Sequence, residues 1–546
     1  MIRIIFIAAV SVFMIACTTG LQSGEGREYS PGHTELQLEM HDGVMLSTDV
    51  FIPRTRKRVP AILVRTPYNK HSERWLAKTL NFFKIAVVIQ DVRGKYGSDG
   101  EFYPFINERD DGLKTLEWIR DQPWSDGTVG GFGASYLGIT QWAISDSLDF
   151  LVPMLSGASI YDFVYPEGVF SLKSSFAWGV VNASPKENSI PPDKVSDGMF
   201  ILPLSEADDS TIKDIGFLTD WMTHETENDY WERLNWRGIA QAPVLSIAGW
   251  YDIFLLGQIR DFQALEAERF PENRMIIGPW CHGNPATGNQ YGGEKRTGKP
   301  GKVLAYTVRA LKRKRYRLGR PFKDARYNLF IMERNEYVGS ETWPPEETVT
   351  VSYYIGPENY LGPSLYSEDG MLSYVYDPSD PYPGLGGTAL GDIVGPAWQN
   401  DNLGRDDQIV FETGTLEKPL VLLGEISATL WLSSDRHCTG FVISLQDVLP
   451  DGRIVNIQEG AANVQLYGQE PEKHQISVWA TGYQLNTGHR MRVVITSSWF
   501  PRFNRNLNSC EPVIAAEKAA PATQKIYYGE GTPSSINLPV YLGLAK

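Results

Sequence analysis

The first part of the chain alternates short apolar runs with amphipathic stretches. The apolar runs lie at residues 61–64, 85–89, 128–132, 151–155, 243–248 and 275–277. Stretches with helical spacing of apolar residues separate several of these runs, at residues 110–120, 139–148 and 255–270. Strands that are apolar throughout and alternate with helices are typical of a parallel sheet covered on both faces. The pattern therefore predicts an α/β domain.

The alternation stops between residues 161 and 237. This segment has scattered aromatic residues and helical spacing, but it has no clear strand pattern. Because it lies between two predicted strands of the sheet, we interpret it as a helical cap inserted into the α/β domain. We assign residues 33–148 and 238–324 to the α/β domain and residues 149–237 to the cap.

The pattern changes again at about residue 325. Short alternating runs at residues 348–354, 428–432, 441–445 and 492–496 are separated by turn signals such as Asp451-Gly452. Many short strands of this kind are typical of an all-β sandwich or jelly roll. We therefore predict a C-terminal β jelly-roll domain over residues 325–546.

The N-terminus has the pattern of a bacterial export signal. One positive charge at Arg3 precedes the apolar residues 4–16, and Cys17 follows directly. This apolar run is too short to span a bilayer as a helix but fits a signal peptide. Residues 14–17 (MIAC) resemble the site at which bacterial lipoproteins are cleaved and lipidated on cysteine, although a plain signal peptide containing a cysteine is the alternative.

These features predict a signal peptide at residues 1–16 and a lipidated tether at residues 17–32, which is rich in Gly and Ser. Thr18, rather than an acidic residue, follows the cysteine, and this indicates sorting to the outer membrane. We expect a lipoprotein of the bacterial cell envelope, held by its lipid on the periplasmic side of the outer membrane.

Composition and charge narrow the range of partners. Apolar residues make up 42% of the chain, and its net charge is −14. The basic runs are short, at residues 54–58 and 312–317. Phosphate backbones bind clustered positive charge, so nucleic acid is not an expected partner. The sequence His224-Glu225-Thr226-Glu227 lacks the ligand set of a metal site. We expect neither a metal nor a cofactor.

Three cysteines remain after Cys17, namely Cys281, Cys438 and Cys510. An odd number does not indicate a disulfide framework. A bridge between Cys438 and Cys510 is compatible with an oxidising compartment, and the sequence leaves both states open.

Ser135 is the candidate nucleophile. It lies within Gly133-Ala134-Ser135-Tyr136-Leu137-Gly138, directly between a predicted strand and a predicted helix. A sharp turn at such a junction exposes the hydroxyl above the sheet, and small neighbours allow the helix to pack on the strand. The common pattern has glycine two residues after the serine, whereas this chain has Leu137 there and glycine one position later.

A catalytic acid and a base are expected later in the chain, in that order. Asp252 follows the predicted strand at residues 243–248, and His282 follows the one at residues 275–277. An aspartate in this position accepts the Nδ1–H of the imidazole and stabilises the imidazolium. We therefore predict a catalytic triad of Ser135, Asp252 and His282.

Several segments together resemble the cocaine esterase-like (CocE/NonD) hydrolases, which are related to X-Pro dipeptidyl-peptidases. The matching segments around the predicted triad are residues 133–138 (GASYLG), 249–252 (GWYD) and 278–282 (GPWCH). Further matches are residues 65–70 (RTPYNK), 90–94 (QDVRG), 376–378 (YDP), 448–453 (VLPDGR) and 500–506 (FPRFNRN). The resemblance covers nearly the whole chain after the tether, and it accounts for the displaced glycine.

The resemblance implies an α/β-hydrolase domain, a helical cap and a C-terminal jelly roll of the galactose-binding-like type. It also implies that the Tyr68 hydroxyl and the backbone N–H of Tyr136 bind the oxyanion of the reaction. Two donors aimed at the developing charge supply a large part of the catalytic effect. We expect Trp178 and Phe254 to line the substrate pocket.

The leading function is hydrolysis of a small carboxylic ester or amide through an acyl-enzyme on Ser135. One alternative is an X-Pro dipeptidyl-peptidase, which holds a free N-terminal amine with acidic groups and typically carries additional domains. A second is an α-amino ester hydrolase, whose members have Glu-Asp shortly after the triad aspartate. This chain has the apolar residues 253–256 there. A surface glycan-binding protein is the non-enzymatic alternative, since fold alone does not decide function.

Overall fold

The computed structural model describes residues 32–183, 190–265, 269–282, 300–312, 319–391 and 393–544. Cys17 and the predicted signal peptide and tether, up to residue 31, lie outside this part. Within the described residues, none of the helices is both long and apolar enough to cross a bilayer.

Three strands of the N-terminal part of the sheet form where the apolar runs at residues 61–64, 85–89 and 128–132 predicted them, and two further strands at one edge were not predicted. The strands are ordered β1-β2-β4-β3-β5, with β3, β4 and β5 parallel and β1 and β2 antiparallel at one edge. The elements in this part are β1 (Gly32–Glu39), β2 (Met45–Ile52), β3 (Val59–Thr66), α1 (Arg74–Phe82), β4 (Ala86–Asp91), α2 (Glu108–Asp121) and β5 (Ser125–Gly131). Strands β3 and β4 are buried along their whole length, as expected for strands covered on both faces.

A second run of strands has the order β6-β7-β8-β9-β10-β11, and a parallel bridge between Gly130 of β5 and Phe150 joins the two runs. The elements of the second run are β6 (Gly133–Ala134), α3 (Tyr136–Ala143), β7 (Pro153–Met154), β8 (Leu245–Tyr251), α10 (Leu255–Gln263), β9 (Arg274–Cys281), α12 (Pro300–Leu311), β10 (Tyr327–Ile331) and β11 (Glu336–Ser340). The strands from β6 to β10 run parallel, and β11 turns back antiparallel at the edge. This half of the chain therefore has the architecture of the α/β-hydrolase fold, as the resemblance implies.

Two segments lie in this sheet although the sequence placed them in other domains. Strand β7 belongs to the range assigned to the cap, and β10 and β11 belong to the range assigned to the jelly roll. An antiparallel hairpin at a sheet edge has the same alternating pattern as a sandwich strand, so the pattern alone does not show which sheet it joins. The residue limits of the three domains stay a prediction.

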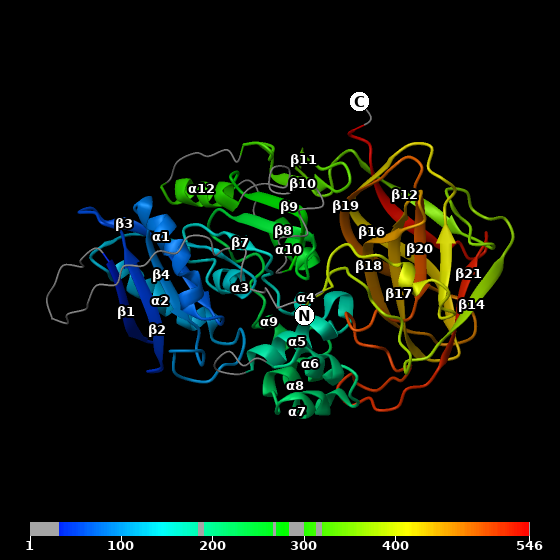
Figure 1. Ribbon diagram of the computed structural model, residues 1–546, viewed down its shortest axis with the longest axis horizontal. Coiled ribbons are helices and arrows are strands. Elements are labelled where there is room, and N and C mark those ends of the chain that lie inside the picture. Colours follow the sequence, from blue (N-terminus) through cyan, green and yellow to red (C-terminus); the bar gives the residue numbers. More distant parts are fainter. Residues whose placement is uncertain are drawn as a thin grey trace.

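Short helices follow β7 and cover the carboxyl ends of the strands. They are α4 (Tyr161–Val164), α5 (Leu172–Asn182), α6 (Pro192–Gly198), α7 (Ala207–Thr211), α8 (Gly216–Thr223) and α9 (Asp229–Glu232). Figure 1 shows these helices gathered between the blue N-terminal end of the molecule and the C-terminal β domain. Most of their aromatic residues, including Trp221 and Trp231, are buried.

The C-terminal part is an all-β domain, as predicted. One sheet contains β13, β12, β22, β16, β21, β14 and β19, and a second contains β15, β20, β17 and β18, with the strand pairs antiparallel. The strands are β12 (Thr348–Ile355), β13 (Leu361–Gly362), β14 (Gly370–Tyr376), β15 (Gln408–Glu412), β16 (Leu420–Ser434), β17 (Cys438–Val448), β18 (Ile454–Gln465), β19 (Glu472–Leu485), β20 (Arg490–Thr496), β21 (Ala522–Tyr528) and β22 (Ser535–Tyr541).

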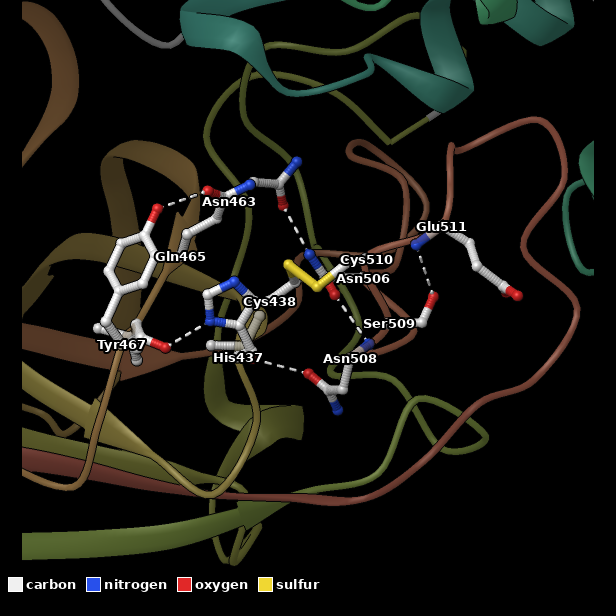
Figure 2. The surroundings of a disulfide bond; sticks show 12 residues. His437, Cys438, Asn463, Gln465, Tyr467, Asn506, Asn508, Ser509, Cys510 and Glu511 are labelled. Atoms are coloured by element: carbon white, nitrogen blue, oxygen red, sulfur yellow. Dashed lines mark hydrogen bonds between the residues drawn. A yellow bond between two sulfur atoms is a disulfide. The ribbon is translucent and has the colours of Figure 1, made fainter.

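A disulfide joins Cys438 at the start of β17 to Cys510 in the long connection between β20 and β21. Figure 2 shows this bond beside His437 and Asn508. The side chain of Asn508 accepts a hydrogen bond from Thr439 and donates one to the Ala520 carbonyl, so the connection is held on both sides of the bond. The structure thus decides a pairing that the sequence left open.

Candidate active site

Ser135 lies at the tight turn between β6 and α3. Its φ of 57° and ψ of −128° are outside the regions that most residues adopt. The turn is held because the Ser135 N–H donates to the Met154 carbonyl at 2.9 Å, and the Gly138 and Ile139 N–H groups donate to the Ser135 carbonyl. Strain of this kind at a strand-to-helix turn is typical of a nucleophile in this fold.

The small residues around Ser135 have the predicted packing role. A Cβ atom at Gly133 would lie 2.4 Å from the Leu137 Cβ, and one at Gly138 would lie 2.5 Å from the Ser156 side chain. Neither site has room for a larger residue without movement of the helix. The displaced glycine at position 138 is therefore where α3 makes its close approach to the Ser156 segment.

The structure brings Ser135, His282 and Asp252 together in one hydrogen-bonded chain. His282 Nε2 lies 3.0 Å from Ser135 Oγ, and His282 Nδ1 lies 2.7 Å from Asp252 Oδ2. Asp252 is fully buried, and its other oxygen accepts the Phe254 N–H at 2.9 Å. With its proton on Nδ1, His282 presents the Nε2 lone pair to the serine hydroxyl.

Three parallel strands deliver these groups to one edge of the sheet. Ser135 follows β6, Asp252 follows β8 and His282 follows β9. Because carboxyl ends of parallel strands meet at the same edge, residues far apart in the sequence become neighbours there. The geometry allows His282 to take a proton from Ser135 while Asp252 stabilises the resulting positive charge.

Tyr68 lies beside the nucleophile, just beyond the end of β3. Its hydroxyl oxygen accepts a hydrogen bond from the Trp178 indole N–H at 2.9 Å. Burial raises the pKa of the Tyr68 phenol, while hydrogen bonds with Trp178 and Ser135 lower it in part. Because Trp178 donates to the phenolic oxygen, the O–H hydrogen of Tyr68 points away from Trp178. The Ser135 hydroxyl lies within hydrogen-bond distance of the same phenol.

Tyr136 is held in place by buried polar groups. Its hydroxyl donates to Glu108 Oε1 at 2.7 Å and accepts the Phe105 N–H at 3.0 Å. Arg65 forms an ion pair with the other Glu108 oxygen at 2.6 Å. Burial and the neighbouring Glu108 carboxylate raise the pKa of Tyr136, so the phenol stays neutral. The side chain is an anchor, and the backbone N–H at the start of α3 is the group available to a ligand.

A small cavity opens at Ser135 and His282. Trp178 and Phe254, both expected from the sequence, lie in its wall. The remaining wall residues are Tyr68, Phe105, Tyr136, Ile139, Phe163, Ile253 and Leu390. Phe105, Phe163 and Leu390 were not expected, because a single apolar residue in a loop or a cap helix gives no signal in the sequence. Leu390 comes from the β domain.

One group of potential metal ligands away from the triad already has cationic partners. Glu35, Asp49 and His71 approach one another at the surface of the β1–β2 sheet edge. Lys70 Nζ lies 2.8 Å from Glu35 and 3.2 Å from Asp49, and Arg74 Nε lies 2.7 Å from Asp49. Positive charge therefore occupies the place that a cation would need. In the segment of residues 224–227, His224 Nδ1 forms a hydrogen bond with the Asp220 carbonyl.

Comparison with known proteins places this geometry in a family. Residues 42–284 match the X-Pro dipeptidyl-peptidase (S15) family, and residues 322–537 match the X-Pro dipeptidyl-peptidase C-terminal non-catalytic domain. Cocaine esterase from Rhodococcus is 30% identical, across 93% of this chain and 98% of that protein. The chain belongs to the cocaine esterase-like hydrolase family.

Solved structures agree with the fold of this family. An aminopeptidase from a Thaumarchaeota archaeon superposes with a TM-score of 0.80 at 21% identity, covering 96% of this chain and 99% of its own. An α-amino acid ester hydrolase superposes with a TM-score of 0.77 at 19% identity, covering 96% and 100%. The α/β-hydrolase domain with a C-terminal β domain is the shared architecture. This cocaine esterase-like protein is therefore a serine hydrolase of ester or amide bonds. The match to the S15 family is also consistent with X-Pro dipeptidyl-peptidase activity.

Proposed function

We propose that Ser135, His282 and Asp252 are the catalytic triad of an esterase that accepts compact apolar acyl groups. The observation that carries this proposal is the hydrogen-bonded chain from Asp252 through His282 to Ser135. It ends in a cavity whose wall is mostly aromatic and aliphatic. A pocket of this kind selects apolar ligands by shape and burial.

In the proposed reaction, Ser135 Oγ attacks the substrate carbonyl carbon while its proton moves to His282 Nε2. Tyr68 O–H and Tyr136 N–H donate to the oxyanion that forms. The intermediate collapses with loss of the alcohol or amine, which receives the proton from His282, and leaves an acyl-enzyme. Water then attacks the acyl group with His282 again as the base, and Ser135 is restored.

The cavity wall supports an acyl group without an ammonium. Among the described residues that form it, none carries a carboxylate. An α-amino acyl group or a peptide N-terminus would bring a positive charge into this apolar space, and burial of an unpaired charge is costly. The wall residue Phe254, two positions after Asp252, contributes an aromatic ring in place of an acidic group.

The nucleophile is tested by Ser135→Ala together with a fluorophosphonate active-site label. We expect the wild-type protein to be labelled and the variant to be unlabelled, with the melting temperature unchanged and ester turnover almost completely lost. Thr140→Ala is a control substitution in the same helix. Retention of a tenth of the activity in pure Ser135→Ala protein would refute the assignment.

Substrate class is tested with neutral chromogenic esters, glutaryl amides and Xaa-Pro amides. The family match favours the Xaa-Pro amides as the second candidate. We expect esters of benzoic or short aliphatic acids to have the highest kcat/KM. Preferential cleavage of Xaa-Pro amides would instead assign the protein to the dipeptidyl-peptidases.

For location, we propose a lipid anchor at Cys17, on the periplasmic side of the outer membrane. The residues before and at this cysteine support it. Cys17→Ser should move the protein from the membrane pellet to the soluble periplasmic fraction. An unchanged distribution would show that the lipid is not what holds it.

A further inference from the structure

Exposed basic residues gather at the end of the sheet opposite the active site, next to the amino ends of β3 and β4. The loop between β2 and β3 contains Arg54, Arg56, Lys57 and Arg58, all exposed. Lys84, just after α1, is exposed as well, and its Nζ donates to the Arg54 carbonyl at 2.9 Å. The loop and the end of α1 are therefore side by side and present their charges together.

The two segments that carry this positive charge contain no acidic residue of their own. Residues 53–59 and 75–85 include six basic residues and no acidic residue, in a chain whose net charge is −14. In the described part of the chain, no salt bridge joins these six side chains to a carboxylate, whereas many other arginines of the molecule have acidic partners, such as Arg93 with Asp111. A cluster left without acidic partners is available to an external anion.

Exposed aromatic residues accompany the charges. Phe82 is 80% exposed, more than any other large apolar side chain of the described residues, and Phe83 beside it is 37% exposed. Their rings pack edge to face on each other, with centroids 5.2 Å apart. Trp75, two helical turns earlier and therefore on the same face of α1, is also 37% exposed. We call Phe82, Phe83, Lys84 and residues 54–58 the basic–aromatic edge.

The strand register brings the N-terminus of the fold to the same place. Gly32, the first residue of β1, pairs with Ile52 at the end of β2, and Phe51 pairs with Val87 near the start of β4. The chain from residue 31, and so from Cys17, therefore joins the fold next to the loop of residues 54–58. Figure 1 shows β1, β2, β3 and α1 at the blue end of the molecule, away from the β domain.

The active site lies at the opposite end of the same strands. Tyr68 follows the carboxyl end of β3, and the basic–aromatic edge precedes its amino end. Strand β3 spans Val59–Thr66, so roughly 25 Å separates the two ends. A surface bound at the edge would leave the cavity at Ser135 open to solvent.

We propose that the basic–aromatic edge docks on a bilayer of anionic phospholipid. Lysine and arginine side chains bind the headgroup phosphates, and Phe82 and Phe83 enter the interface between headgroups and acyl chains. The combination of both residue types favours a membrane over a nucleic acid, which would require a longer basic surface than this acidic chain provides. The docking goes beyond the hydrolase function and orients the active site away from the membrane.

Binding to vesicles tests the proposal in full chains that all carry Cys17→Ser. The vesicles contain phosphatidylcholine with about 30% phosphatidylglycerol, or phosphatidylcholine alone. In one variant Arg56, Lys57 and Arg58 become Gln, and in a second Phe82 and Phe83 become Ser. The matched controls change three exposed lysines of the β domain, Lys418, Lys473 and Lys518, to Gln, or the 77% exposed Tyr467 to Ser. Residues 1–31 are the same in all of them, so their effect cancels.

We expect each edge variant to bind phosphatidylglycerol vesicles at least tenfold more weakly than its parent, and each control to bind like the parent. Binding should fall with added salt, since surface charges are screened. Turnover of a soluble ester should be unchanged in every variant. Equal binding by the edge variants and the parent, or absence of binding by the parent, would overturn the proposal.

A dye attached at the edge gives a second, site-specific test. In the Cys17→Ser chain, Cys281 is buried and Cys438 and Cys510 are joined, so a cysteine introduced at position 82 is the one open to labelling with a polarity-sensitive dye. Emission from Phe82→Cys should shift to the blue with phosphatidylglycerol vesicles, and emission from Tyr467→Cys should not. No shift at position 82 in vesicle-bound protein would refute docking through this edge, whatever holds the chain. Neither test depends on Ser135 or on lipidation of Cys17.

Discussion

At the scale of single residues, the contact between Trp178 and Tyr68 explains how a phenol can be kept ready as a donor. The indole N–H occupies the tyrosine oxygen, so the O–H hydrogen can point to the Ser135 side. Trp178 was expected only as an apolar wall of the pocket. Its hydrogen bond shows that it also sets the orientation of the group proposed to bind the oxyanion.

Replacing Tyr68 by Phe should reduce kcat roughly 100- to 1,000-fold and hardly change KM, because the lost donor acts where charge has developed. Steady-state kinetics with a neutral ester would measure this. Tyr165→Phe is the matched control, since the Tyr165 hydroxyl donates to the Trp221 carbonyl in the cap core. That variant should lose about 1 kcal/mol of stability and little rate. Normal turnover by Tyr68→Phe would make Tyr68 structural.

The pH dependence of kcat/KM should show no decline from Tyr68 on the alkaline side up to about pH 10. An ordinary tyrosine loses its proton near pH 10. Burial raises the pKa of Tyr68, which moves this loss to still higher pH and keeps the donor protonated.

The profile is measured with an uncharged ester, so that substrate ionisation does not contribute. Tyr68→Phe should have the same alkaline profile as the wild type, at its lower rate. A decline of the wild-type rate near pH 10 that is absent from Tyr68→Phe would show that Tyr68 loses its proton at its ordinary pKa.

At the scale of secondary-structure elements, α3 depends on its close approach to the segment after β7. Gly138→Ala places a methyl group 2.5 Å from the buried Ser156 side chain. We expect a loss of roughly 1–3 kcal/mol in the free energy of unfolding. A lower kcat should accompany it, because the start of α3 carries Ser135 and the Tyr136 N–H.

Denaturant unfolding and ester kinetics measure the two effects of Gly138→Ala. Gly216→Ala is the control, because no atom lies within 4 Å of a Cβ at the start of α8. Unchanged stability and rate in Gly138→Ala would show that Ser156 moves aside without cost.

The same helix shows where hydrophobic spacing is informative and where it is not. The sequence predicts a helix at residues 139–148, and α3 spans Tyr136–Ala143. Leu148 and Phe150 are buried too, so apolar residues beyond the helix continue its pattern. Apolar spacing reports burial, and a buried turn after a helix has the same spacing as the helix itself.

At the scale of the whole molecule, the β domain completes the site. Gln458 of β18 donates to the Trp250 carbonyl at 3.1 Å, and the Trp250 indole N–H donates within the catalytic sheet to the Phe330 carbonyl of β10 at 2.6 Å. The bond from Gln458 holds the β domain directly behind the turn that carries Asp252. From this position the β domain also supplies Leu390 to the cavity.

The disulfide should stabilise the part of the β domain that contacts the cap. It joins residues 72 positions apart, and the connection that contains Cys510 bonds to the cap through Asn504, Val513 and Ile514. We expect the double change of Cys438 and Cys510 to Ser to lower the free energy of unfolding by roughly 2–4 kcal/mol.

Urea unfolding with and without reductant measures this effect. Reductant should destabilise the wild-type protein to the level of the double variant and should not affect that variant further. Equal stability of oxidised and reduced wild type would show that the bond does not constrain the unfolded chain.

The sequence by itself determined six of the strands and three of the helices of the α/β half, and it placed Ser135, Asp252 and His282 at strand ends in the order their chemistry requires. These inferences succeed as far as they do because burial on both faces of a strand and the sharp turn after it are local properties of a few residues. Their catalytic roles remain to be tested by substitution.

Only the tertiary structure decided which distant groups meet. It joined Cys438 to Cys510, added β10 and β11 to the catalytic sheet, and placed Leu390 in the cavity. It also set the Trp178 N–H on Tyr68 and brought the loop of residues 54–58 beside Lys84. Each of these contacts joins segments separated along the chain, and hydrophobic pattern carries no information about which partner a segment will find. The register of the strands and the packing of whole domains settle that choice.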